Sequence, residues 1–556
     1  MNVKKHIVIL MLLIGLAFAL RVVKVWDIPS SLSWDEVSIG YNAYSILKTG
    51  KDEHGKFIPL DAFTAYGDYK PPLSIYITVP FVALFGLNEF SVRIPSVLFG
   101  TLTVLLTYFL VKELLYKTKN ENSVISFVPI LSATLFAISP WHINLSRAGF
   151  EATIALFFVV LGIYLIFLSM RKPKIWYGSF IPFVLAIYTF NSSRYFVPFL
   201  AIGIVCLYWK ILKNQWKYIA VGCLISIMAL LPIMPHLFSK EARLRFAEVN
   251  IFTDSSVVTI SNKRIEESNN AWWAKIIYNR RIGYFRSFLI HYFDHFQPEY
   301  LFFKGDGNPK FSIQNVGQLY LIEAPFLVIG VFTLIRDFPT VGILLLYWLC
   351  MAIVPAAVAR ETPHALRTLN SLPTWQIFIA YGILQSVGKF LLDKPIWKKR
   401  FHPAKILMYF PAIIIFFCYV CSVSYYLFTY YVHYPRMYSG EWQYGYREAF
   451  RFVSPLEKNY DSIYVTETIG RPYMYALFYN KIDPQEFFRN KNASFDAAGF
   501  YHVYGFGKYR FVKDMPNECS GKCLFVGQSD GVMNNVNVLK TISLMNGNPV
   551  LTIYEK

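Results

Sequence analysis

Long, uninterrupted apolar runs limit the folds open to this chain more than any other feature of its sequence. A helix needs roughly 18 to 20 nearly uncharged residues to cross the ~30 Å hydrocarbon core of a bilayer, and several runs reach that length. Only 16% of the 556 residues are charged and 55% are hydrophobic, whereas soluble domains carry about a quarter charged residues. The sequence therefore predicts an all-α polytopic membrane protein.

The basic residues cluster in short connections between the apolar runs, which the positive-inside rule assigns to the cytoplasmic face. This clustering explains the net charge of +19 and argues against nucleic acid as a partner. The first run follows Lys4 and Lys5 and has no cleavage site after it, so we interpret it as an uncleaved helix whose N-terminus is inside. Eleven crossings of the cytoplasmic membrane then put the C-terminal end outside. We expect the spans at about 6–26, 93–115, 124–144, 151–169, 175–190, 195–209, 218–235, 317–335, 339–358, 369–388 and 405–432.

A further apolar run, 72–86, would put the basic cluster at 112–119 on the wrong side if it crossed. We therefore interpret it as an interfacial helix. The outer face then holds the first loop (27–92), the turn at 147–151, a long loop (236–316) and the tail (433–556). The tail alternates β-like runs at 462–466 and 550–554 with a helical run at 471–479, so we expect a small extracytoplasmic mixed α/β domain after a membrane domain of residues 1–432.

Two of the seven cysteines, Cys519 and Cys523, stand apart from the apolar runs in the polar tail. Cysteines four residues apart can close a disulfide in an oxidising compartment, or they can supply half of a metal site. The sequence offers no second pair of ligands, which favours the disulfide.

Acidic residues at outer span ends are the first candidates for chemistry. Asp35 and Glu36 follow the first span among aromatic residues, where partial desolvation makes a carboxylate a better proton acceptor; simple solvation is the alternative. Glu151 opens another span, and Arg147 four residues earlier could form a local ion pair with it. Alternatively, Glu151 faces the same cavity as Asp35.

Basic residues at the outer face are the second group. Lys70, after Tyr69 and before a double proline, is either a snorkelling anchor or a cation for a lipid phosphate. Arg194 and Arg367, the latter close to His364, are either phosphate ligands or headgroup anchors. The polar segment 302–310 is expected to be a structural turn. The sequence has no Walker loop, nucleotide-binding glycine fingerprint or His/Cys ligand cluster, so any sugar or phosphate donor is expected to be lipid-linked and no metal is assigned.

These motifs, together with Glu89-Phe-Ser-Val-Arg-Ile-Pro-Ser96, make the chain resemble the dolichyl-phosphate-mannose protein mannosyltransferase superfamily. This superfamily includes the bacterial aminoarabinose transferases. The resemblance covers residues 5–390, most specifically 34–151. It implies a GT-C fold and transfer of a sugar from a polyprenyl-phosphate donor to a lipid, glycan or protein.

The resemblance also implies roles for individual residues. Asp35 matches the general base, Lys70 the lysine that contacts the donor phosphate, and Glu151 a second acid that is usually Asp in relatives. Tyr69 stands where many relatives have Glu, so a contact to sugar or metal is not carried over. Arg194 and Arg367 match donor-phosphate ligands less securely, and Glu36, Tyr69, Arg147 and His364 are supporting candidates.

We therefore predict an inverting membrane glycosyltransferase whose site faces outward, with Asp35 as its base. A transporter or flippase is disfavoured because its ionisable residues usually lie near the bilayer midplane, and here they lie at span ends. A non-catalytic envelope assembly protein is the second alternative. It is distinguished by whether Asp35 and Glu151 converge.

Overall fold

The computed structural model describes residues 3–116, 124–239, 249–392, 403–496, 499–532 and 536–556. Part of the basic cluster at 112–119, part of the connection between the predicted spans 369–388 and 405–432, and part of the long loop 236–316 lie outside these residues. The chain forms two compact units. We call residues 1–20, 99–145 and 152–426 the helical unit, and residues 21–98, 146–151 and 427–556 the mixed unit.

Five helical stretches among the described residues are long and apolar enough to cross a membrane, and a bent pair of helices would make a sixth. The pair, Ile125–Ala137 and Pro140–Arg147, bends by 53°. The five stretches are Glu89–Leu114, Glu151–Arg171, Asn191–Leu237, Pro339–Ala357 and Phe410–Tyr438. The structure therefore has several spans but does not establish the predicted number of eleven.

Some predicted spans take other forms. Residues 175–190 are divided between a 3-10 turn and two short helices, α8 (Trp176–Ser179) and α9 (Ile181–Ile187), with proline at the start of α9. The apolar run 72–86 forms α3 (Leu73–Phe85). Thirteen residues of helix rise about 20 Å, which is shorter than the ~30 Å hydrocarbon core.

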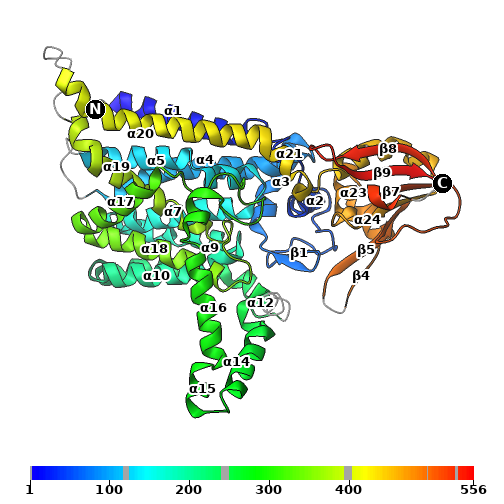
Figure 1. The fold of residues 1–556 in the computed structure, drawn as a ribbon, viewed down its shortest axis with the longest axis horizontal. Coiled ribbons are helices and arrows are strands. Elements are labelled where there is room, and N and C mark those ends of the chain that lie inside the picture. The colour runs from blue at the N-terminus through cyan, green and yellow to red at the C-terminus, as the bar shows by residue number, and fades with distance from the viewer. Residues whose placement is uncertain (1–2, 117–123, 240–248, 393–402, 497–498, 533–535) are drawn as a thin grey trace. The chain divides into compact units, whose positions relative to one another are not determined.

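The other helices of the helical unit pack as a bundle, with a helical hairpin of α14 and α16 joined by α15 (Figure 1). Helices α17 and α19 approach closely because Gly330 and Gly382 have no side chains: a Cβ at either would collide with the backbone of the opposite helix. The helices are α1 (Val3–Val22), α4 (Glu89–Leu114), α5 (Val128–Ala137), α6 (Pro140–Arg147), α7 (Glu151–Arg171), α10 (Asn191–Leu212), α11 (Trp216–Leu230), α12 (Met234–Leu237), α14 (Ser255–Glu267), α15 (Trp272–Ile277), α16 (Arg280–Asp294), α17 (Glu323–Asp337), α18 (Pro339–Ala357), α19 (Thr374–Leu392) and α20 (Pro403–Phe428).

The mixed unit contains, in its described residues, a seven-stranded sheet in the order β4-β5-β6-β3-β7-β9-β8. Strand β3 is parallel to both β6 and β7, and the other neighbouring strands are antiparallel. The strands are β3 (Ser462–Thr466), β4 (Asn492–Phe495), β5 (Tyr501–Phe506), β6 (Tyr509–Val512), β7 (Cys523–Gln528), β8 (Asn537–Ser543) and β9 (Pro549–Glu555). This sheet confirms a mixed C-terminal domain.

Helix α21 (Tyr434–Tyr438) comes first in the tail, and three further short helices share the hydrophobic core of the sheet: α22 (Tyr446–Val453), α23 (Pro472–Tyr479) and α24 (Pro484–Asn490). The predicted helical run 471–479 is α23, whose residues Pro472 to Phe478 are all buried. One hydrophobic core joins them to helix α2 (Trp34–Thr49) of the first loop, through residues such as Val37, Tyr41 and Phe478. The first loop and the tail therefore form a single unit, although they are about 400 residues apart in sequence.

Candidate active site

Helix α2 positions Asp35 in its first turn. The helix is capped by Ser33: the Glu36 amide donates to the Ser33 hydroxyl at 3.4 Å, and the Ser33 amide donates to the Glu36 carboxylate at 2.9 Å. Such a capping box fixes where a helix begins, and a carboxylate in the first turn is favoured by the helix dipole. The Asp35 side chain is 43% exposed, so a second molecule can reach it.

Lys70 lies against Asp35 from a two-stranded hairpin, β1 (Phe63–Ala65) and β2 (Asp68–Lys70). Its Nζ donates to Oδ1 of Asp35 at 2.6 Å, although the lysine side chain is only 7% exposed. Burial lowers the Lys70 pKa, but the negative charges of Asp35 and Glu151 outweigh that effect, so the Lys70 pKa is raised above its ordinary value. Lys70 is therefore a buried, charged cation in a group of acids.

Glu151, the first residue of α7, is the third member of this group, because its charge acts on the Lys70 ammonium. The structure thus brings Asp35, Lys70 and Glu151 together in the mixed unit. Residues 148–150 are a turn followed by a residue without regular structure, so Arg147 and Glu151 lack the helical spacing on which the suggested local ion pair depends.

Glu36 connects the two acid-bearing segments. Its Oε1 accepts from Arg93 Nε at 2.7 Å and from the backbone amide of Gly149 at 2.9 Å. Both charged side chains are fully buried. Because Glu36 follows Asp35 and Gly149 lies two residues before Glu151, this carboxylate fixes the distance between the segments.

Arg93, which the sequence analysis did not single out as a site residue, completes the network around Glu36. Its guanidinium also donates to the carbonyls of Val25, Pro29 and Ser31. Several donors in a rigid plane suit this task. An arginine at the start of an otherwise apolar span is the signal that could have identified it.

Arg147 has a similar structural environment. Its guanidinium donates to the carbonyls of Arg21, Val23 and Ile28 and to the hydroxyl of Tyr430. It is fully buried, and its contacts hold the chain that leads into α2. The geometry suits a structural role better than contact with a ligand.

The tail also reaches the Asp35 segment. The hydroxyl of Tyr66 donates to the carbonyl of Trp34 at 2.9 Å, and the guanidinium of Arg471 lies 5.1 Å from the centre of the Tyr66 ring. Tyr69, in β2 beside Lys70, is half-buried. Tyr66 and Arg471 were not predicted, because their positions depend on the packing of distant segments.

The predicted arginines lie in the helical unit. Arg194 is in the first turn of α10, and Arg367 lies in the segment before α19. The two segments are joined by a hydrogen bond of 3.2 Å from the Asn370 amide to the Ser193 hydroxyl. Both arginines are partly buried.

His364, near Arg367, is a buried ring stacked on Phe311 with 4.8 Å between the ring centres. Burial lowers its pKa well below the ordinary value, so it is a neutral side chain. The nearby loop is fastened by Asp306, whose carboxylate accepts from the amides of Asn308 and Ala365. Burial raises the Asp306 pKa to about 6. Segment 302–310 thus contains a buried acid as well as the predicted turn.

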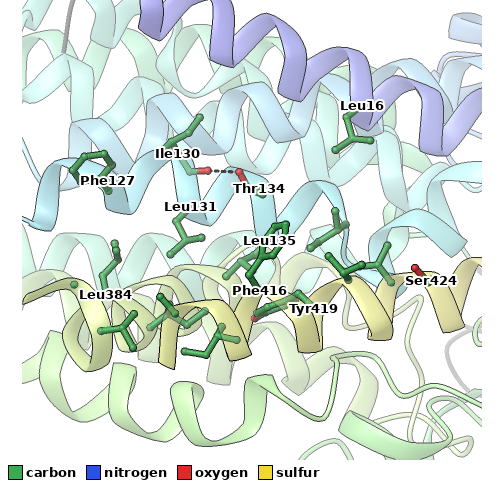
Figure 2. Close-up of a pocket in the computed structure, with 18 residues that line it drawn as sticks. Leu16, Phe127, Ile130, Leu131, Thr134, Leu135, Leu384, Phe416, Tyr419 and Ser424 are labelled. Atoms are coloured by element: carbon green, nitrogen blue, oxygen red, sulfur yellow. Dashed lines mark hydrogen bonds between the residues drawn. The ribbon is translucent and has the colours of Figure 1, made fainter. Parts of the chain in front are cut away.

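No group of three or more His, Cys, Asp or Glu residues that could hold a metal occurs in the described part of the chain. The helical unit does contain an apolar cavity of about 780 Å³. Figure 2 shows Leu16, Phe127, Leu131, Leu135 and Phe416 around it, with the hydroxyls of Thr134, Tyr419 and Ser424 as its polar groups. Its chemistry suits a hydrocarbon chain.

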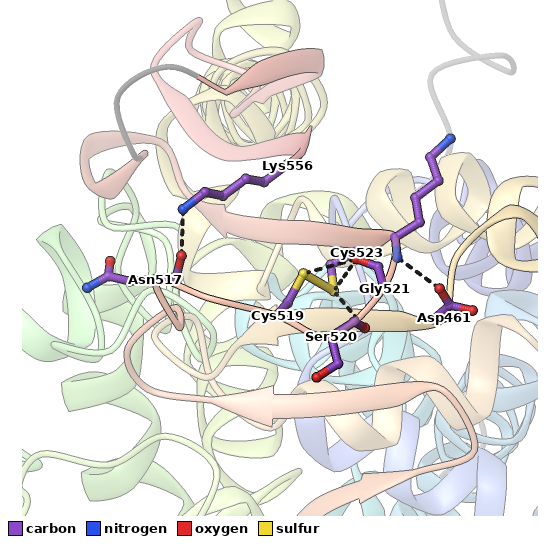
Figure 3. The surroundings of a disulfide bond; sticks show 8 residues. Asp461, Asn517, Cys519, Ser520, Gly521, Cys523 and Lys556 are labelled. Carbon is purple, nitrogen blue, oxygen red and sulfur yellow. Dashed lines mark hydrogen bonds between the residues drawn. A yellow bond between two sulfur atoms is a disulfide. The ribbon is translucent and has the colours of Figure 1, made fainter.

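Cys519 and Cys523 form a disulfide before and at the start of β7. Figure 3 shows it beside Gly521 and Asp461, whose carboxylate accepts from the Lys522 amide at 2.8 Å. The disulfide lies at the opposite end of the strand from Gln528 and belongs to the scaffold rather than to the acid cluster.

Known proteins resemble this chain in sequence and in fold. Residues 69–238 match the model of the family described as dolichyl-phosphate-mannose-protein mannosyltransferase. A putative mannosyltransferase of Bacillus subtilis, YkcB, is 28% identical over 172 residues, which are 30% of this chain and 21% of the relative. The match therefore spans about a fifth of the length of that relative.

Two solved structures share the fold. ArnT from Cupriavidus metallidurans, bound to undecaprenyl phosphate, has a TM-score of 0.53 at 10% identity, covering 100% of this chain and 98% of ArnT. The oligosaccharyltransferase of Archaeoglobus fulgidus, tethered to an acceptor peptide, has a TM-score of 0.51 at 13% identity, covering 86% of this chain and 63% of that one. The predicted resemblance is confirmed: this multi-pass chain is similar to mannosyltransferases in sequence and to GT-C membrane glycosyltransferases in fold.

Proposed function

We propose that this protein is a membrane glycosyltransferase that moves a sugar from a polyprenyl-phosphate donor to an acceptor hydroxyl at the outer face of the cytoplasmic membrane. The observation that carries the proposal is the 2.6 Å contact between Lys70 and Asp35, with Glu151 in the same charged group. A buried cation suits an anionic phosphate, and an exposed carboxylate beside it suits a proton acceptor.

The proposed reaction is a single displacement. The acceptor oxygen forms a bond to the anomeric carbon while its proton passes to the Asp35 carboxylate. The bond from the anomeric carbon to the phosphate oxygen breaks, and polyprenyl phosphate leaves with the bonding electron pair. Attack from the face opposite the leaving group inverts the anomeric configuration.

Lys70 would stabilise the phosphate as negative charge develops on the leaving oxygen. A preorganised cation in a water-poor site contributes strongly to such a transition state. Arg194 and Arg367 stay predicted phosphate ligands. Glu151 would orient the acceptor or Asp35. Glu36 would hold the segments of Asp35 and Glu151 in place rather than contact a substrate, because its oxygens already accept hydrogen bonds from Arg93, Gly149 and Ser33.

The proposal includes the predicted topology, with eleven crossings, the N-terminus inside and the tail outside. It is supported by structural neighbours that bind related lipids or acceptors: ArnT was solved with undecaprenyl phosphate, and the archaeal enzyme with an acceptor peptide. An apolar cavity among the helices agrees with a lipid-linked donor. The sugar is unassigned, and a hexose and a pentose are both candidates.

The experiment is a donor screen with the purified full-length protein in nanodiscs. A panel of undecaprenyl-phosphate hexoses and pentoses is supplied with membrane extract as acceptor, and released undecaprenyl phosphate is measured by mass spectrometry. The proposal expects release from at least one donor, and loss of that release in Lys70→Met. A protein that binds none of the donors and releases no lipid phosphate would contradict it.

A further inference from the structure

The sheet of the mixed unit has a topological switch point next to β3. Strands β6 and β7 lie on opposite sides of β3, and both are parallel to it. The chain thus leaves β3, returns as β6 on one side and then as β7 on the other. In open α/β sheets, ligands bind outside the carboxyl ends of the strands at such a point. Here those ends are Thr466 and Gln528.

A pocket of about 270 Å³ lies at this position. Thr468 and Ile469 come from the loop after β3, Gln528 is the last residue of β7, and Ser529 and Asp530 follow it. Pro549 and Val550 of β9 close the pocket. The lining is Thr468, Ile469, Gln528, Ser529, Asp530, Pro549 and Val550.

The polar groups of the pocket are held in place by the protein itself. The Gln528 amide donates to Oδ2 of Asp530 at 3.2 Å, and the Thr552 hydroxyl donates to the Ser529 hydroxyl at 3.0 Å. Asp530 is exposed, so a ligand can reach its carboxylate. The result is a preorganised set of hydrogen-bonding groups, which lowers the cost of binding.

The chemistry of the lining selects a class of ligand. Hydroxyl, amide and carboxylate groups match a ligand rich in hydroxyls, while Ile469 and Val550, which pack on the hydrophobic core, offer an apolar floor. The lining contains a carboxylate and no lysine or arginine, which disfavours phosphate and other anions. The volume lies just below the roughly 300 to 1,000 Å³ of pockets for drug-sized molecules, which suits one sugar ring.

The pocket is connected to the segment that bears Asp35. Gly470, directly after Ile469, has a φ of +135°, and a Cβ added there would lie 3.1 Å from the Trp34 ring. Such a backbone conformation favours glycine, and the contact distance leaves little room for a side chain beside Trp34. The loop that lines the pocket therefore packs on the residue before Asp35.

We propose that this pocket, which we call the switch-point pocket (residues 468–469, 528–530 and 549–550), binds a neutral sugar ring of the acceptor. The inference rests on the proposed glycosyl transfer and adds that the acceptor is itself a carbohydrate or carries one. The carboxylate of Asp530 accepts from the sugar hydroxyls, and the apolar floor contacts the face of the ring.

The test is ligand-observed saturation-transfer NMR on the full-length protein in nanodiscs. The probes are the methyl glycosides of glucose, mannose, galactose and N-acetylglucosamine, with methyl phosphate as an anionic probe. The proposal expects saturation transfer to at least one glycoside, reduced at least tenfold in Asp530→Ala. Asp514→Ala removes an exposed carboxylate of the same domain outside the pocket and should retain the full signal.

Absence of signal from every glycoside, an equal signal in Asp530→Ala, or a signal from methyl phosphate alone would overturn the inference. Measuring lipid-phosphate release by Asp35→Asn beside glycoside binding by Asp530→Ala distinguishes this inference from the proposed function. If Asp35→Asn still releases lipid phosphate at the wild-type rate while glycoside binding depends on Asp530, the transfer mechanism fails and the pocket stands. If Asp35→Asn no longer releases lipid phosphate and glycoside binding is the same in Asp530→Ala as in the wild type, the transfer mechanism stands and the pocket fails.

Discussion

Lys70 donates a hydrogen bond of 2.6 Å to Asp35, although the two residues are 35 positions apart in sequence. The ammonium is buried, whereas the carboxylate is 43% exposed. While the pair is intact, Lys70 neutralises the carboxylate that would accept the proton. A donor phosphate would compete for the same ammonium, so donor binding would free the Asp35 carboxylate to act as the base.

Replacing this cation tests that relationship. Lys70→Met should reduce transfer by about 10² to 10³-fold, because the phosphate loses a preorganised cation in a site with little water. Lys70→Arg keeps the charge but changes its shape, so it should retain more activity. Initial rates of lipid-phosphate release measure both variants. Equal rates for Lys70→Met and the wild type would show that the lysine is only a membrane anchor.

The buried pair of Glu36 and Arg93 should be important for stability. Glu36→Gln leaves the Arg93 guanidinium without its buried counterion, and breaking such a pair costs about 3 to 5 kcal/mol of unfolding free energy. Thermal unfolding in detergent should show a lower midpoint than the wild type. Glu441→Gln, at an exposed position, is the matched control and should leave the midpoint unchanged. If both variants unfold with the wild-type midpoint, the pair does not hold the site together.

Asp306 predicts a dependence of stability on pH. Burial raises its pKa to about 6 in the folded protein, against about 3.9 in an unfolded chain. The folded state therefore holds the proton more tightly, so this contribution is fully present below about pH 4 and is lost as the pH rises through about 6. The change amounts to at most about 3 kcal/mol.

Asp306→Asn removes this titrating carboxyl group. The midpoint of thermal unfolding should therefore change less between about pH 4 and 6.5 in this variant than in the wild type. Asp254→Asn is the control, because Asp254 caps α14 near the surface and its hydrogen bonds with Ser256 lower its pKa rather than raise it. An unchanged pH profile in Asp306→Asn would show that this carboxyl does not titrate as its burial implies.

The disulfide provides a separate prediction about the tail. Closing the short loop between Cys519 and Cys523 should stabilise the folded domain by about 2 kcal/mol relative to the dithiol. Hydrogen exchange of β7 should therefore accelerate in a Cys519→Ser/Cys523→Ser variant, while exchange in α16 stays the same. Equal exchange rates in β7 with and without the two cysteines would contradict this prediction.

Sequence reasoning identified the structural features that depend on local patterns. The predicted β-like run 462–466 is strand β3, and the predicted β-like run 550–554 lies within β9. Apolar length predicted α4 and α7 but not the division of residues 175–190 into short helices, because Pro182 interrupts a run that composition alone treats as continuous.

The candidate site shows the same limit. Asp35, Lys70 and Glu151 were identified by motif and side of the membrane. The link from Glu36 to Arg93 and Gly149 could not be predicted, because it joins segments 57 and 113 residues apart. The shared core of the first loop and the tail was also missed, since nothing local in either segment specifies its partner.

The most direct test of the central claim is the rate of sugar transfer by Asp35→Asn, measured with the donor that the screen identifies. Asparagine keeps the size of the side chain and removes its basicity, so transfer should fall about 10² to 10⁴-fold while the protein still binds undecaprenyl phosphate. A correctly inserted Asp35→Asn protein that transfers sugar at the wild-type rate would contradict the proposal that Asp35 is the general base.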